Sequence, residues 1–153
     1  MIPKKVEDFL ISHGLTYIEH EVGSTATAEM AAARNGVEVG QIVKTMLCVS
    51  KDGQRFLVLC PGDRKINSSK LKAATGVGTK FATSEETYQL TGYFPGGVCP
   101  FAVENIEILA DASLSRFDVI FPAAGNNASG VPISFQKLVK ITSAKVVSVT
   151  KED

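Results

Sequence analysis

A ten-residue stretch, 91–100, carries three glycines and two prolines, which is more backbone specification than an ordinary connector between two elements requires. Glycine serves where the backbone must reach positive φ or where another group must approach the main chain closely, whereas proline fixes φ and removes an N–H donor. We therefore expect a rigid loop that belongs to neither helix nor sheet. Its fixed donors are the backbone amides of Gly97, Val98 and Cys99, because Pro100 has no N–H.

On both sides of this loop the chain alternates between helical and extended character. Helices are expected over residues 6–10, 28–33, 70–75, 84–90 and 135–141, from apolar spacing and from caps at Thr25 or Thr27, at Asn67 or Ser68 and at Thr83. Strands are expected over residues 16–22, 42–49, 55–60, 78–82, 106–109, 117–121, 131–135 and 145–149. Because turns such as Asp52-Gly53 join neighbours as hairpins, we predict a single α+β domain over residues 1–153 with a mixed, mostly antiparallel sheet.

Charge and cysteine content narrow the class of protein. Formal net charge is zero, so no whole-molecule attraction to nucleic acid is expected, but residues 62–80 hold five cations against one acid. Such a basic segment fits local binding of a polyanion as well as it fits a solvated helix face. The three cysteines show no zinc spacing, no apolar run approaches the ~20 residues of a membrane helix, and the N-terminus lacks a signal-peptide core. We expect a cytoplasmic protein with reduced thiols, no metal and no cofactor.

Lys44 is the one charged residue in the apolar run 42–49. Because burying an unpaired ammonium costs several kcal/mol, a lysine in mid-strand must reach a sheet edge or a partner. Two interpretations stay open: an edge lysine that keeps its charge in solvent, and an anchor for a phosphate or carboxylate. Side chains alternate along a strand, so Thr45 is expected to pack on the opposite face unless the strand ends or bulges there.

The amides of the 91–100 loop could bind a developing oxyanion, an effect worth ~2.7–4 kcal/mol per donor. The loop is neither a Walker loop, which needs Gly-Lys-Ser/Thr, nor a dinucleotide fingerprint, because it follows an expected helix. A tight structural crossover is the alternative. Cys99 invites a nucleophile interpretation, but a small buried thiol competes with it, because no Cys-His pattern is present. Without a Ser-His-Asp signature or paired carboxylates, an enzyme of this kind must act on an activated substrate through positioning.

Several motifs occur in a fixed order: Ile42-Val43-Lys44-Thr45, Pro61-Gly62-Asp63, Ile66-Asn67-Ser68-Ser69-Lys70-Leu71, Thr91-Gly92-Tyr93 and Gly96-Gly97-Val98-Cys99-Pro100. This ordered set resembles the YbaK/ProX family of aminoacyl-tRNA editing domains, which also occur as insertions in prolyl-tRNA synthetases. The likeness runs from about Phe9 to Val149. It implies a curved mixed sheet flanked by helices, and hydrolysis of the ester of mischarged tRNA, chiefly alanine or cysteine on proline tRNA.

The resemblance also implies residue roles. Lys44 matches the family's invariant lysine, which holds the 3′-terminal adenosine, and residues 96–100 match the loop that positions the aminoacyl carbonyl. The expected catalytic set is Lys44, Gly96, Gly97, Val98 and Cys99. The expected substrate-binding set is Thr45, His20, Asp63, Asn67, Pro100 and Gly130. We further infer that tRNA phosphates contact Arg64, Lys65, Lys70 and Lys72. The expected partners are the acceptor end of a mischarged tRNA and, as a second candidate, prolyl-tRNA synthetase.

Two positions depart from the specificity patterns of the family. Alanine-specific members usually carry asparagine after the lysine, where this chain has Thr45, as cysteine-specific members do. Cysteine-specific members carry an aspartate in the strand after the late glycine turn, where this chain has Pro132. The amino acid removed therefore does not transfer from the resemblance. Two other functions stay open: a non-catalytic module that binds a tRNA 3′ end or a nucleotide, and a hydrolase that uses the Cys99 thiol.

Overall fold

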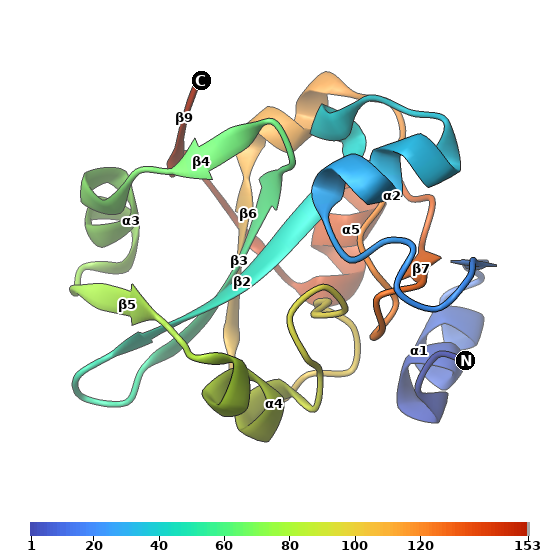
Figure 1. The fold of residues 1–153 in the computed structure, drawn as a ribbon. Coiled ribbons are helices and arrows are strands. Elements are labelled where there is room, and N and C mark those ends of the chain that lie inside the picture. The colour runs from blue at the N-terminus through green and yellow to red at the C-terminus, as the bar shows by residue number, and fades with distance from the viewer. Residues whose placement is uncertain (153) are drawn as a thin grey trace.

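The computed structural model describes residues 1–152, which form a five-stranded mixed sheet with helices on both faces (Figure 1). The helices are α1 (Lys4–Ser12), α2 (Ala28–Asn35), α3 (Ser68–Thr75), α4 (Ser84–Thr91) and α5 (Phe135–Thr142), with short 3-10 helices η1 (Val39–Gln41) and η2 (Ala112–Arg116). The strands are β1 (Ile18–Glu19), β2 (Val43–Ser50), β3 (Arg55–Pro61), β4 (Arg64–Ile66), β5 (Thr79–Phe81), β6 (Glu107–Asp111), β7 (Ser129–Gly130), β8 (Lys145–Val147) and β9 (Thr150–Glu152).

The strand order of the sheet is β5-β2-β3-β6-β8. The β2–β3 hairpin is antiparallel and runs in register from the Val43–Pro61 pair to the Val49–Arg55 pair. On the outer side of β2, β5 pairs antiparallel with residues 48–50 alone. On the other side of the hairpin, β6 runs parallel to β3 and β8 runs parallel to β6. Two small two-stranded sheets, β1–β7 and β4–β9, lie outside the main sheet. Among residues 1–152, no strand consequently pairs with the first half of β2 on its outer edge.

Alternation along β3 builds a core on each face of the sheet. Leu57 and Leu59 are fully buried in the larger core, which α1 and α5 cover. Phe56 and Val58 point the other way and pack against Leu71 of α3. Because burying one such side chain stabilises the fold by ~1.5–3 kcal/mol, β3 is pinned from both faces. It therefore holds β2, and the residues on the edge of β2, in a fixed position.

Helix boundaries follow the capping signals of the sequence. In four of the five α-helices the N-cap side chain accepts a backbone N–H from the first turn, which is the bond that stabilises a helix start. The caps with this bond are Thr27, Asn67, Thr83 and Ser134. Glycine in the left-handed region ends three of the helices, at Gly36, Gly76 and Gly92. The caps predicted for α2, α3 and α4 are therefore confirmed.

Three expected strands are wrong or too long. Residues 117–121 and 131–135 form only single bridges, Ile42 with Phe121 and Ile120 with Ile133, because Pro122 and Pro132 interrupt the ladder. The expected strand over 16–22 shrinks to β1, which pairs with the two-residue β7. In contrast, β4 was missed, since it depends on pairing with β9 near the far end of the chain.

Within residues 1–152, no helix combines the length and the apolar character required to cross a bilayer. The same residues contain no cluster of three or more His, Cys, Asp or Glu that is placed to hold a metal ion.

Candidate active site

A cavity of about 510 Å³ opens beside the unpaired edge of β2. It lies between the N-terminus of α2, the end of β5, α4 and the 91–100 loop; in Figure 1, α2 lies at the upper right end of β2 and α4 lies below the strand. The volume falls within the ~300–1,000 Å³ range of small-molecule sites. Four of the predicted site residues line it: Lys44, Thr45, Gly96 and Val98. The structure thus brings the predicted lysine and the predicted loop to one cavity.

The loop is shaped by a β-turn over residues 94–97. The Gly97 N–H donates to the Phe94 carbonyl over 2.9 Å, and Gly96 has φ +92°. Pro95 in the second position and a glycine with positive φ in the third are typical of a type II turn. The Gly97 amide was expected to be a free donor, but the turn uses it. The amides of Gly96 and Val98 make no hydrogen bond within residues 1–152, and both residues line the cavity.

Gly97 is required for a different reason than Gly96. A Cβ on Gly97 would lie 2.5 Å from the Cα of Asn126, so the loop presses directly on the backbone of the 125–128 segment. A Cβ on Gly96 would meet the Ala26 carbonyl oxygen at 3.3 Å, in a backbone conformation that L-residues rarely adopt. The two glycines therefore fix the loop between the start of α2 and the segment before β7.

Lys44 extends from the edge strand to the neighbouring β4. Its Nζ donates to the Arg64 carbonyl oxygen over 2.8 Å, which uses one of the three N–H groups. No carboxylate of the described residues forms an ion pair with Lys44. The side chain is half-buried and faces Cys60 across the hairpin, where burial raises the pKa of the Cys60 thiol to about 12 despite the nearby ammonium. Lys44 thus lines the cavity and keeps two N–H groups and a positive charge that no carboxylate of the described residues pairs with.

Thr45 was expected to pack away from the side of Lys44, yet it lines the same cavity. The reason is that β2 is an edge strand at this point, so the cavity extends around the edge and contacts both faces of the strand. The hydroxyl Oγ1 of Thr45 is buried and has no hydrogen-bond partner within the described residues. Because buried hydroxyls are almost always bonded, an unmatched one beside a cavity is a candidate ligand contact.

Four of the predicted substrate-binding residues lie outside the cavity lining and have partners elsewhere. The Asp63 carboxylate accepts two bonds from Arg116, at 2.8 and 3.2 Å, and this pairing lowers the pKa of Asp63. Asn67 accepts the Lys70 amide as the N-cap of α3. The His20 ring lies 3.3 Å from the Asn35 side-chain oxygen, and Gly130 pairs with Ile18. These four residues are engaged by partners within the fold, and none of them lines the cavity.

Cys99 and Pro100 are also buried outside the cavity lining. Cys99 has no exposed surface, and burial raises the pKa of its thiol to about 12. Its neighbours are the Phe101 carbonyl and the Tyr93 hydroxyl, which provide no base. A nucleophilic cysteine needs a lowered thiol pKa and access to substrate, so this environment argues against the thiol hydrolase.

The predicted phosphate contacts lie on β4 and α3. Lys65, Lys70 and Lys72 are all exposed, and Lys70 also donates to the Thr150 carbonyl over 3.1 Å. Arg64 holds Lys44 through its main chain. The single acid of the segment, Asp63, is already paired with Arg116. The β4–α3 surface next to Lys44 is therefore basic.

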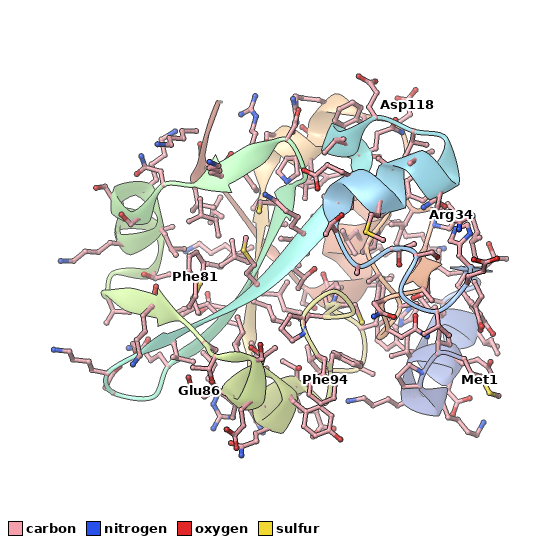
Figure 2. The ribbon with its side chains drawn as sticks, viewed as in Figure 1. Met1, Arg34, Phe81, Glu86, Phe94 and Asp118 are labelled. Atoms are coloured by element: carbon pink, nitrogen blue, oxygen red, sulfur yellow. The ribbon has the colours of Figure 1, made fainter. Side chains whose placement is uncertain are left out.

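Several wall residues were missed as site residues. They come from the start of α2, from β5 and from the segments around β7, and they include Thr25, Thr27, Glu29, Phe81, Phe121 and Ser129. Phe81 is the last residue of β5 and is 58% exposed (Figure 2). The capping pattern at Thr27 indicated where α2 begins, but no local pattern indicated that this helix start faces Lys44.

The chain is similar to proteins of one known family. Residues 22–141, most of the chain, match the model of the aminoacyl-tRNA editing domain family. The Bacillus subtilis protein YwhH is 33% identical over 124 residues, which make up 80% of this chain and 79% of YwhH. The proline–tRNA ligase of Bacillus licheniformis is 38% identical over 106 residues, which make up 68% of this chain but 18% of the ligase. The match to the ligase is thus confined to one part of a much longer protein.

Two solved structures share the fold over almost the whole chain. A protein described as a proposed trans-editing enzyme for prolyl tRNA synthetase has a TM-score of 0.89 at 30% identity, and the match covers 97% of this chain and 96% of that one. Hypothetical protein APE2540 has a TM-score of 0.89 at 31% identity, with 96% and 99% of the two chains covered. The predicted α+β fold with a mixed sheet is confirmed.

Proposed function

The chain belongs to the aminoacyl-tRNA editing domain family, and we propose that it hydrolyses the ester of a mischarged tRNA in trans. The proposed substrate is tRNA(Pro) carrying cysteine, alanine or another small amino acid. The observation that carries the proposal is the shared cavity, which is lined both by Lys44 and by two loop residues whose amides are unpaired in the described residues. The similarity to part of a proline–tRNA ligase makes proline tRNA the first substrate to test.

In the proposed reaction, water attacks the ester carbonyl carbon, the bond to the ribose oxygen breaks, and that oxygen takes a proton. The developing oxyanion would accept hydrogen bonds from the Gly96 and Val98 amides, each worth ~2.7–4 kcal/mol of barrier where such donors have been removed. The Lys44 ammonium would hold the anionic 3′ end. Glu29 is the one carboxylate in the described lining, and the proposal assigns the rate to positioning rather than to acid–base chemistry by this residue.

The limited selectivity of a synthetase explains why such a hydrolase is needed. A synthetase pocket shaped for proline cannot strongly reject a smaller amino acid, since one methylene is worth only ~1–3 kcal/mol. A second site of limited volume can clear the resulting errors. In the proposed complex the tRNA backbone lies over β4 and α3, where Lys65 and Lys72 would contact phosphates. Each lost contact should reduce the slope of log affinity against log salt by about one unit.

The proposal is tested with a deacylation panel of alanyl-, cysteinyl-, seryl- and threonyl-tRNA(Pro) and the matched prolyl-tRNA(Pro). We expect release of at least one small amino acid and no release of proline. Hydrolysis of none of the mischarged species would refute the proposal. If the protein nevertheless binds the mischarged tRNA, it is a module that recognises the 3′ end.

A further inference from the structure

The outer edge of β2 carries backbone groups that no strand pairs. At one end of this edge the Val43 N–H donates to the Phe121 carbonyl over 3.1 Å. At the other end the Ala82 N–H donates to the Leu47 carbonyl over 2.9 Å, where β5 begins to pair. All four of these residues line the cavity. Between the two bonds, the edge of the strand faces the cavity.

The register of the hairpin fixes which groups this edge presents. On the inner side of β2, the Gly62 N–H donates to the Ile42 carbonyl over 2.8 Å, and Pro61, which has no N–H, lies opposite Val43. Backbone groups of an antiparallel strand alternate between its two sides. Thr45 therefore directs both its N–H and its C=O away from β3, as Val43 and Leu47 do. These two groups lie in the gap between Phe121 and Ala82.

Three polar groups of Thr45 thus have no hydrogen-bond partner in the described residues. Its N–H and C=O face an unpaired edge, and its hydroxyl is buried without a partner in the described residues. Backbone and side-chain groups removed from bulk water are nearly always hydrogen-bonded in folded proteins. The buried hydroxyl and the two unpaired backbone groups of this one cavity-lining residue point to a ligand that forms hydrogen bonds at this edge of β2.

We propose that Thr45 pairs with the aminoacyl group of the substrate as a one-residue β-bridge. The Thr45 N–H donates to the ester carbonyl oxygen, and the Thr45 C=O accepts a hydrogen bond from the α-ammonium. In an antiparallel pair, two opposed residues exchange both bonds in this way, and an α-amino ester carries the same donor and acceptor on one carbon. This inference rests on the proposed function and adds to it a recognition of the α-amine that is independent of the amino-acid side chain.

The pairing is compatible with the proposed oxyanion contacts. A carbonyl oxygen has two lone pairs, so it can accept one bond from the strand edge and one from a loop amide on the facing wall. The β-bridge would hold the carbonyl between β2 and the 91–100 loop. Specificity for the amino acid is then left to the fit of its side chain in the remaining space.

The first test removes the α-amine from the substrate. The fastest mischarged tRNA of the panel is compared with its deamino analogue, which for alanine is propionyl-tRNA. Each kcat/KM is divided by the uncatalysed hydrolysis rate of the same ester, because an α-ammonium itself labilises the bond. We expect the normalised value to fall about tenfold or more, as for loss of a hydrogen bond to a charged group. Equal normalised values would overturn the β-bridge and leave the proposed function intact, whereas hydrolysis of neither ester would overturn both.

A second test removes the Thr45 N–H by an amide-to-ester replacement at that position. Val49 is the matched control, because it lies on the same strand with the same orientation but its outer edge pairs with Lys80 of β5. We expect the replacement at Thr45 to lower kcat/KM about fivefold or more, as for loss of one neutral hydrogen bond to substrate. The replacement at Val49 should lower the melting temperature more and leave kcat/KM unchanged. A wild-type kcat/KM after replacement at Thr45 would refute the proposed pairing.

Discussion

Replacement of Gly97 by alanine is expected to damage both stability and catalysis, because the new methyl group has no room. Its Cβ would lie 2.5 Å from the Cα and 2.7 Å from the C and N of Asn126. Non-bonded carbons settle at ~3.5–4.0 Å, so the loop and the 125–128 segment must separate by about 1 Å. Overpacking of this kind costs ~1–3 kcal/mol, and a displacement of ~1 Å at a catalytic group can cost about 100-fold in rate.

The assay measures the melting temperature and kcat/KM of Gly97→Ala with the fastest substrate of the panel. For a chain of this size the expected loss of stability lowers the melting temperature by roughly 2–12 °C. Gly78→Ala is the control, because Gly78 has no neighbour within 4 Å and needs no positive φ. That control should match or exceed the wild type in stability and retain its rate. A wild-type melting temperature together with a wild-type rate for Gly97→Ala would refute the packing of the loop against Asn126.

Three further predictions follow from the surroundings of individual residues. Cys99→Ala should retain the deacylation rate, and iodoacetamide should not inhibit the wild type, because burial raises the pKa of the Cys99 thiol to about 12; inhibition together with protection by substrate would restore the thiol mechanism. Glu29→Gln should leave the pH–rate profile unchanged, and a loss of about 100-fold or more would identify Glu29 as a general base. The bond from Arg116 lowers the pKa of Asp63, so the pair stabilises the fold above the normal aspartate pKa, and this contribution is lost as the pH falls through the lowered value. With the two side chains 35% and 41% exposed, Asp63→Asn should cost only about 0.5–1 kcal/mol at neutral pH, and its difference in melting temperature from the wild type should vanish in strong acid.

The elements that the sequence predicted well are those fixed by local chemistry. Thr27 and Thr83 cap α2 and α4 with their own side chains, and Gly36 ends α2 in the left-handed region. The β2–β3 hairpin follows from two apolar runs around Asp52-Gly53. These signals act over a few residues, so they need no knowledge of the rest of the fold.

The features that were missed depend on tertiary pairing. The Gly97 amide is not a free donor, because the 94–97 turn closes on it. Thr45 faces the cavity only because β5 stops pairing with β2 at residue 48. Asp63 was expected at the substrate, but Arg116, distant in sequence, holds it. The ordered motifs of the sequence indicated that these residues lie near the site. Which of them line the cavity depends on their contacts with residues that are distant in the sequence.

The most direct test of the central claim, that Lys44 and the loop amides act together in one cavity, is single-turnover hydrolysis of mischarged tRNA(Pro) by Lys44→Met. Methionine keeps an aliphatic stem and removes only the ammonium and its bond to the Arg64 carbonyl, so the fold should lose about 0.5–1.5 kcal/mol. The account predicts a rate about 100-fold or more below the wild type in a protein that still melts cooperatively. Hydrolysis by Lys44→Met at the wild-type rate would contradict it.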